Sequence, residues 1–101
     1  MRANSQFLKK IREHLETKGL KPFGTADDYL TYVVYQGIMT LDEPTLTKEL
    51  LTSSMLYMEN KPTYNGFYRG VNRALAKLQQ FKNEPYVDIS KFIYIIAREI
   101  N

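Results

Sequence analysis

The sequence contains no cysteine and only one histidine among its 101 residues. Without cysteine the chain cannot form a disulfide framework, a thiolate zinc site or a cysteine nucleophile. The histidine, His14, lies among Lys10, Arg12 and Glu13, and no partner is spaced to make it a catalytic group. We therefore expect His14 to lie at the surface, and we expect no catalytic residue, no metal site and no enzyme activity.

Long apolar runs are also missing. The longest strongly apolar run, residues 92–97, is far shorter than the ~20 residues that span a bilayer. Charged residues interrupt the first segment, residues 1–16, which therefore lacks the apolar core of a signal peptide. No glycine-rich loop is present that would cradle a phosphate group, and no cofactor is expected. These absences favour a cytoplasmic protein without membrane contact.

What is present is typical of one globular domain. Hydrophobic residues make up 44 % of the chain and charged residues 25 %, which argues against a disordered or fibrous protein. The length is sufficient to bury one core without disulfides or a metal. No internal repeat, linker or low-complexity segment divides the sequence. Residues 1–101 are predicted to form a single domain.

Charge is unevenly distributed along the chain. Residues 1–24 carry six Lys or Arg against two Glu, residues 25–60 carry one Lys against six acids, and residues 61–101 carry seven Lys or Arg against three acids. The three segments therefore have net charges of +4, −5 and +4, within a total of +3. Such a layout suits a protein with one side facing a polyanion, although ordinary solvated surface explains it as well.

Apolar residues recur at three- and four-residue spacing through most of the chain, and no segment shows sustained alternation. This periodicity predicts an all-α protein, a compact bundle of about five helices. The predicted helices cover residues 5–18, 25–41, 45–59, 63–80 and 89–100. Gly19 is expected to stop the first helix in a left-handed conformation, while Thr25 and Asp88 are expected to cap the second and last helices.

The Asn65-Gly66 pair poses a choice between the turn of a β-hairpin and the first turn of a helix. The residues that follow, FYRGVNRALAKL, keep a helical period for about three turns, so we predict a helix with Thr63 as its N-cap. Gly70 within this helix is unfavourable by ~1 kcal/mol relative to alanine. We interpret Gly70 as a point of close approach to the third helix.

A helix over residues 63–80 would have one apolar face and one polar face. The apolar face comprises Phe67, Val71, Ala74, Leu75 and Leu78, and the opposite face comprises Asn65, Arg69, Asn72, Arg73, Ala76 and Gln80, with Lys77 and Tyr68 at its edges. Arginine can pair with guanine, asparagine with adenine, and lysine or tyrosine with phosphate oxygens. A polar helix that follows another helix after a short turn has the layout of a helix-turn-helix. An ordinary solvated face is the alternative.

The order of several segments resembles a known bacterial family. The segments are KGLKPFGTADDYL, TYVVYQGI, TKELLTSSMLYMENKPT, FYRGVNRAL and EPYVDISKFIYIIAREI. They run as in the C-terminal DNA-binding domain of the sporulation stage 0 master transcription regulator, and the match covers roughly residues 8–100. Its specific part is the combination of a Gly-x-x-Pro loop, an Arg-x-x-x-Arg helix and a proline-led final helix. The resemblance implies an all-helical domain that binds promoter DNA through a helix-turn-helix as paired copies.

Carried over by position, the resemblance makes residues 45–59 the scaffold helix and residues 63–80 the recognition helix. It places Asn65, Tyr68, Arg69, Asn72 and Arg73 where the family contacts DNA. The chain departs from the family in a shorter segment 81–87 and at Tyr57, where the family has a small residue.

These observations predict a sequence-specific transcription regulator that binds double-stranded DNA as a dimer. Candidate DNA-binding residues are Tyr64, Asn65, Tyr68, Arg69, Asn72, Arg73 and Lys77, and the basic first helix is expected to add affinity. The alternative is a helical interaction module that keeps the fold but contacts another protein, such as the transcription machinery or another regulator.

Overall fold

The computed structural model describes residues 4–20, 24–41, 47–78 and 88–100. Within these ranges the chain is all-helical and has no strand, which confirms the predicted fold class. The five helices are α1 (Ser5–Glu16), α2 (Thr25–Met39), α3 (Thr47–Met55), α4 (Tyr64–Lys77) and α5 (Ile89–Ile100). No helix in the described part of the chain is both long enough and apolar enough to cross a membrane.

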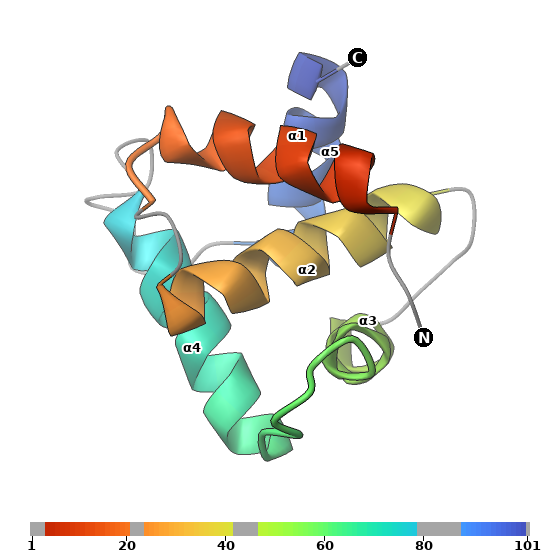
Figure 1. Ribbon diagram of the computed structural model, residues 1–101, viewed down its shortest axis with the longest axis vertical. Coiled ribbons are helices and arrows are strands. Elements are labelled where there is room, and N and C mark those ends of the chain that lie inside the picture. The colour runs from red at the N-terminus through yellow and green to blue at the C-terminus, as the bar shows by residue number, and fades with distance from the viewer. Residues whose placement is uncertain (1–3, 21–23, 42–46, 79–87, 101) are drawn as a thin grey trace.

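Helix α2 lies at the centre of a compact fold and contacts each of the other four helices (Figure 1). Helix α1 crosses one side of α2, and α3 and α4 pack against another. In the view of Figure 1, α5 lies mainly behind α1, and it contacts both α1 and α2. Every helix contributes to one continuous core. Its largest fully buried side chains are Phe67, Phe92, Ile11, Leu15, Leu30, Leu51, Leu75, Leu78, Ile96, Val33, Val34 and Val71.

The predicted start of α1 and the left-handed stop at Gly19 are confirmed, but the helix ends at Glu16 rather than at residue 18. The Asn4 side chain accepts hydrogen bonds from the backbone N–H groups of Gln6 and Phe7, so Asn4 is the N-cap. After the helix, Gly19 has a φ of 111°, and the backbone N–H of Leu20 donates to the carbonyl of Leu15. A left-handed residue followed by such a bond satisfies carbonyl groups that a helix end leaves free.

The predicted N-cap of α2 is wrong by one residue. Gly24 is the N-cap, with φ −71° and ψ 135°, and its carbonyl accepts the first helical bond from Asp28 N–H at 2.8 Å. Thr25 is already helical. The sequence favoured threonine because its side chain can cap a helix, but Gly24 supplies only the extended backbone and makes no side-chain cap bond. The helix ends at Met39, before the predicted residue 41.

Helix α3 is shorter than predicted at its C-terminal end. It stops at Met55 rather than Glu59, because the backbone tightens there into i→i+3 bonds such as Tyr57 N–H to Ser54 O at 3.2 Å. Tyr57 then turns toward α2, where its hydroxyl donates to Gln36 Oε1 at 2.7 Å. The chain after Met55 thus packs on α2 through Tyr57, where the prediction had a further turn of helix. The predicted start of this helix lies outside the described residues.

Helix α4 begins as predicted, which excludes the hairpin. The Thr63 hydroxyl oxygen accepts the backbone N–H of Gly66 at 3.1 Å. The predicted C-terminal end of this helix is wrong: the helix ends at Lys77, because Leu78 is extended, with φ −68° and ψ 134°, and completely buried. The remaining predicted helical positions, 79 and 80, lie outside the described residues.

Gly70 is a point of close approach, but to α2 rather than to α3. A Cβ atom placed on Gly70 would lie 2.7 Å from Cδ2 of Tyr29, which is closer than carbon atoms can pack. The prediction of a contact with the third helix is therefore wrong. It failed because the main support of α4 is the more extensive packing against α2.

Candidate nucleic-acid interface

The predicted division of α4 into two faces is confirmed. Its buried residues are Phe67, Gly70, Val71, Ala74 and Leu75. Its exposed residues are Asn65, Gly66, Tyr68, Arg69, Asn72, Arg73, Ala76 and Lys77. The packing of the apolar face against α2 therefore leaves the candidate polar face in contact with solvent.

The exposed face of α4 is basic. The helix contains no acidic residue, and it carries Arg69, Arg73 and Lys77 at successive i, i+4 positions. Within the residues that the structure describes, no carboxylate lies within ion-pair distance of Arg69 or Arg73. Their guanidinium groups are therefore available to an anion from outside the chain.

Lys77 differs from the two arginines. Its Nζ lies 3.2 Å from Oδ1 of Asp27, a residue of α2 whose side chain is only 4 % exposed. A buried carboxylate requires a compensating charge or hydrogen bonds. Lys77 thus compensates a charge of the protein itself, and its ammonium group is only partly available to a ligand.

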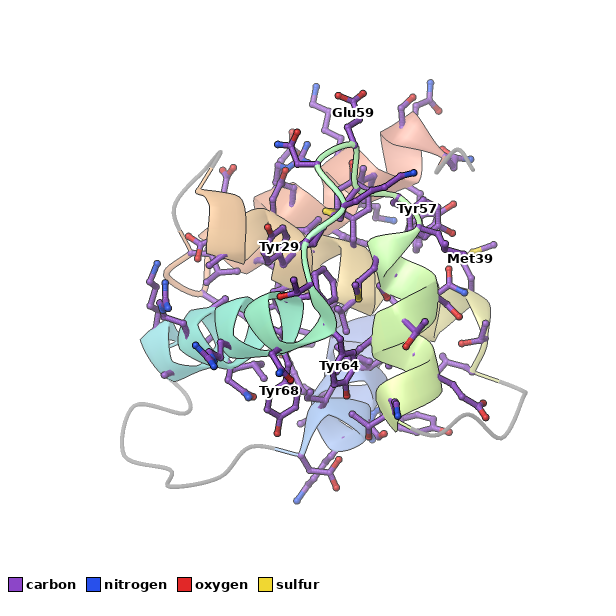
Figure 2. All side chains as sticks on the ribbon, turned by 90° about the horizontal axis from the view of Figure 1, so that it is seen from below. Tyr29, Met39, Tyr57, Glu59, Tyr64 and Tyr68 are labelled. Carbon is purple, nitrogen blue, oxygen red and sulfur yellow. The ribbon has the colours of Figure 1, made fainter. Side chains whose placement is uncertain are left out.

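Tyr64 and Tyr68 lie next to one another on the N-terminal half of α4 (Figure 2). Their ring centroids are 6.2 Å apart, and the ring planes differ by 23°. Tyr64 is half-buried and packs against the core, whereas Tyr68 is exposed. Tyr64 is therefore held by the core, and its ring lies beside the exposed ring of Tyr68, which carries a hydroxyl group.

The connection between α3 and α4 comprises residues 56–63. This connection is longer than the turn of about 3–4 residues that joins the two helices of a typical helix-turn-helix. Figure 1 views α3 nearly along its axis while α4 lies across the view, so the two helices cross. They also contact each other. The helix-turn-helix itself stays a prediction.

Most cations of α1 and of the turn that follows it are engaged within the protein. Arg12 Nη2 lies 2.8 Å from Asp28 Oδ1, and Lys18 Nζ lies 3.0 Å from Glu99 Oε1. His14 Nε2 also lies 3.0 Å from that carboxylate oxygen. The hydrogen bonds from His14 and then from Lys18 lower the pKa of Glu99. These ion pairs connect α1 to α2 and α5, and they reduce the charge that α1 can offer to DNA.

The structure also contains a cavity that sequence reasoning missed. It has a volume of about 360 Å³ and is lined by Asp28, Tyr29, Tyr32, Tyr57, Met58, Glu59 and Asn60. Burial, and then the proximity of Tyr35, raises the pKa of Tyr57 in its wall. No periodicity in the sequence predicts this cavity, because it forms only when the segment after α3 folds back onto α2.

Among the described residues, no cluster of His, Asp and Glu is arranged to hold a metal ion.

The fold and the exposed face define a class of protein, a small all-helical protein with a basic helix on its surface. Comparison with protein-family models, with curated proteins and with solved structures gave no match. The resemblance to the sporulation regulator therefore stays a prediction, as do the DNA contacts assigned through it.

Proposed function

We propose that the protein binds double-stranded DNA through the exposed face of α4 and regulates transcription. The observation that carries this proposal is the pair formed by Arg69 and Arg73, which are exposed, one helical turn apart and without a carboxylate partner in the described part of the chain. An acid-free helix face of this kind attracts the phosphates of a duplex.

The geometry of α4 suits insertion into a major groove. The groove is about 12 Å wide and admits one α-helix, and α4 buries only the face that packs against the protein. Asn65, Arg69 and Asn72 follow one another at i, i+4 and i+7 along the exposed side. In the proposed complex Asn65 and Asn72 pair with adenine and Arg69 pairs with guanine, since these side chains bind those base edges bidentately.

The flanks of α4 supply the phosphate contacts in this proposal. Arg73 lies one turn beyond Arg69, and the Tyr68 hydroxyl lies on the exposed side of the tyrosine pair with Tyr64. Lys77 contributes less, because it is shared with Asp27. Phosphate contacts fix the register of a helix on DNA but carry no sequence information.

One recognition helix reads only a few base pairs, so sequence-specific regulators of this kind commonly bind as dimers to two half-sites. We include a dimer of this chain in the proposal. Half-sites would then be separated by one helical turn of DNA, about 34–36 Å, or by a multiple of it.

Selection of bound duplexes from a random pool tests the proposal. Enrichment of a sequence motif supports it, and Arg69→Ala should then weaken binding to that motif by about 1–3 kcal/mol. Arg98→Ala is the matched control, because Arg98 is an exposed arginine on α5 away from the proposed interface. Equal effects of the two substitutions, or no enrichment above the input pool, would contradict the proposal.

A second candidate function is an interaction module that contacts another protein. It is favoured by the large apolar side chains that stay exposed in the described part of the chain, which are Met39, Leu56, Tyr68 and Tyr94. Tyr94 is 53 % exposed on α5, outside the buried stripe that Ile89, Phe92, Ile93, Ile96 and Ala97 form on this helix. Binding to a protein partner that Tyr94→Ser abolishes, together with absent duplex binding, would select this alternative.

A further inference from the structure

The cavity of about 360 Å³ lies between the start of α2 and the segment that follows α3. Figure 2 shows Tyr29 on α2, Tyr57 at the end of α3, and Glu59 at the tip of the connection that leads into α4. The volume falls within the range of about 300–1,000 Å³ that small-molecule sites occupy. A small molecule bound there would contact two elements that are distant in sequence.

The lining of the cavity is aromatic and acidic. Three tyrosines, two carboxylates, one methionine and one asparagine form it, and none of these lining residues is basic. The carboxylate of Asp28 is compensated by Arg12, whose Nη2 lies 2.8 Å from Oδ1, but Arg12 is not a lining residue. Glu59 has no ion pair within the described residues. A negative charge at the rim of the cavity is therefore left uncompensated.

The tyrosine rings are held in place by other aromatic side chains. The ring of Tyr29 packs at 4.8 Å on Phe67 and meets Gly70 on α4. The rings of Tyr32 and Tyr57 stack at 5.6 Å with an interplanar angle of 20°. Rings fixed in this way lose little conformational freedom when a ligand binds, and aromatic faces attract cations.

A strained backbone position directly follows the last residue that lines the cavity. Lys61, which directly follows Asn60, is the non-glycine residue with a positive φ, 24°. Such conformations are unfavourable by about 1–3 kcal/mol and occur frequently at ligand sites. Lys61 lies between the lining residues 58–60 and Thr63, the N-cap of α4.

From this arrangement we propose that the cavity binds a small organic cation with an alkylammonium group. The tyrosine rings contact its alkyl groups, and the carboxylate of Glu59 compensates its charge. This site is separate from the exposed face of α4 and does not depend on DNA binding. Because Tyr29 also contacts Phe67 and Gly70, a bound cation would be in contact with the support of α4.

The test uses choline as the probe and compares it with the uncharged alcohol of the same shape, in which carbon replaces the quaternary nitrogen. NMR titration of the whole chain follows the tyrosine ring resonances. Choline should shift the resonances of Tyr29, Tyr32 and Tyr57 in a saturable manner, and the alcohol should bind at least about tenfold more weakly, because it lacks the charge that cation–π contact and ion pairing require.

Glu59→Gln removes one carboxylate from an exposed position, so the fold should be unaffected. It should weaken choline binding about 1.5- to 5-fold, and Tyr32→Leu should weaken it about two- to fivefold. The matched control is Glu49→Gln, which changes an exposed acid of α3 that does not line the cavity. Equal binding of choline and the alcohol, no saturable shift, or equal effects of Glu59→Gln and Glu49→Gln would overturn the proposal.

Discussion

Replacement of Gly70 by alanine tests the packing that supports α4. Alanine is favoured over glycine in a helix by ~1 kcal/mol, so a position without neighbours would become more stable. At Gly70, however, the new Cβ would lie 2.7 Å from Cδ2 and 3.2 Å from Cε2 of Tyr29. Overpacking of this kind is unfavourable by about 1–3 kcal/mol. We therefore expect Gly70→Ala to lower the free energy of unfolding by up to about 2 kcal/mol.

The side chain of Tyr29 cannot relieve this contact easily, because its ring also lies 4.8 Å from Phe67. Urea unfolding followed by circular dichroism measures the change. Ala76→Gly, at an exposed position of the same helix, measures the intrinsic difference between the two residues in α4 and should lower stability by ~1 kcal/mol.

The decisive measurement for this contact is a double-mutant cycle. In a Tyr29→Ala background the ring is absent, so Gly70→Ala should become stabilising by about the helix propensity difference, ~1 kcal/mol. An increase in stability on Gly70→Ala in the unmodified chain would refute the close packing of α4 against α2. So would an effect of the same sign and size in both backgrounds.

Three further predictions concern the cap of α4 and two ion pairs. Thr63→Ala removes the side-chain acceptor for the first turn of α4 and should lower the free energy of unfolding by ~1 kcal/mol in urea titrations; no change would contradict the capping role. Because hydrogen bonds from His14 and Lys18 lower the pKa of Glu99, this carboxylate stabilises the fold above its unfolded pKa. That contribution to the free energy of unfolding is lost as the pH falls through the lowered pKa of Glu99 in the folded protein. Glu99→Gln should remove this part of the pH dependence, and an acid unfolding curve that is the same as in the unmodified chain would contradict the role of Glu99. Lys77→Met should lower the thermal midpoint, because Asp27 is buried and loses this cation; an unchanged midpoint would show that the pair contributes nothing.

The parts of the fold that follow from local periodicity could be predicted from the sequence. In α4 the spacing of Phe67, Val71, Ala74 and Leu75 marks the buried face directly, because the rest of the protein covers this helix on one side only. The exposure of Arg69 on the opposite face follows from the same helical geometry.

Features that depend on contacts between distant residues could not be predicted. The pairing of Lys77 with Asp27 joins residues that are far apart in the sequence and meet only when α4 packs on α2. The early end of α3 depends on the contacts of Tyr57 with α2, and the same contacts create the cavity. Helix propensity is too weak to oppose such tertiary interactions.

The salt dependence of duplex binding tests the central proposal most directly. Fluorescence anisotropy with a labelled duplex gives the binding constant of the unmodified chain and of Arg73→Ala over a series of salt concentrations, with Arg98→Ala as the control. Each neutralised phosphate contributes ~0.9 to the slope of log K against log salt. We predict a steep decrease of affinity with salt for the unmodified chain and a slope smaller by ~0.9 for Arg73→Ala only. Absent binding at low salt, or the same slope for all three proteins, would contradict DNA binding through α4.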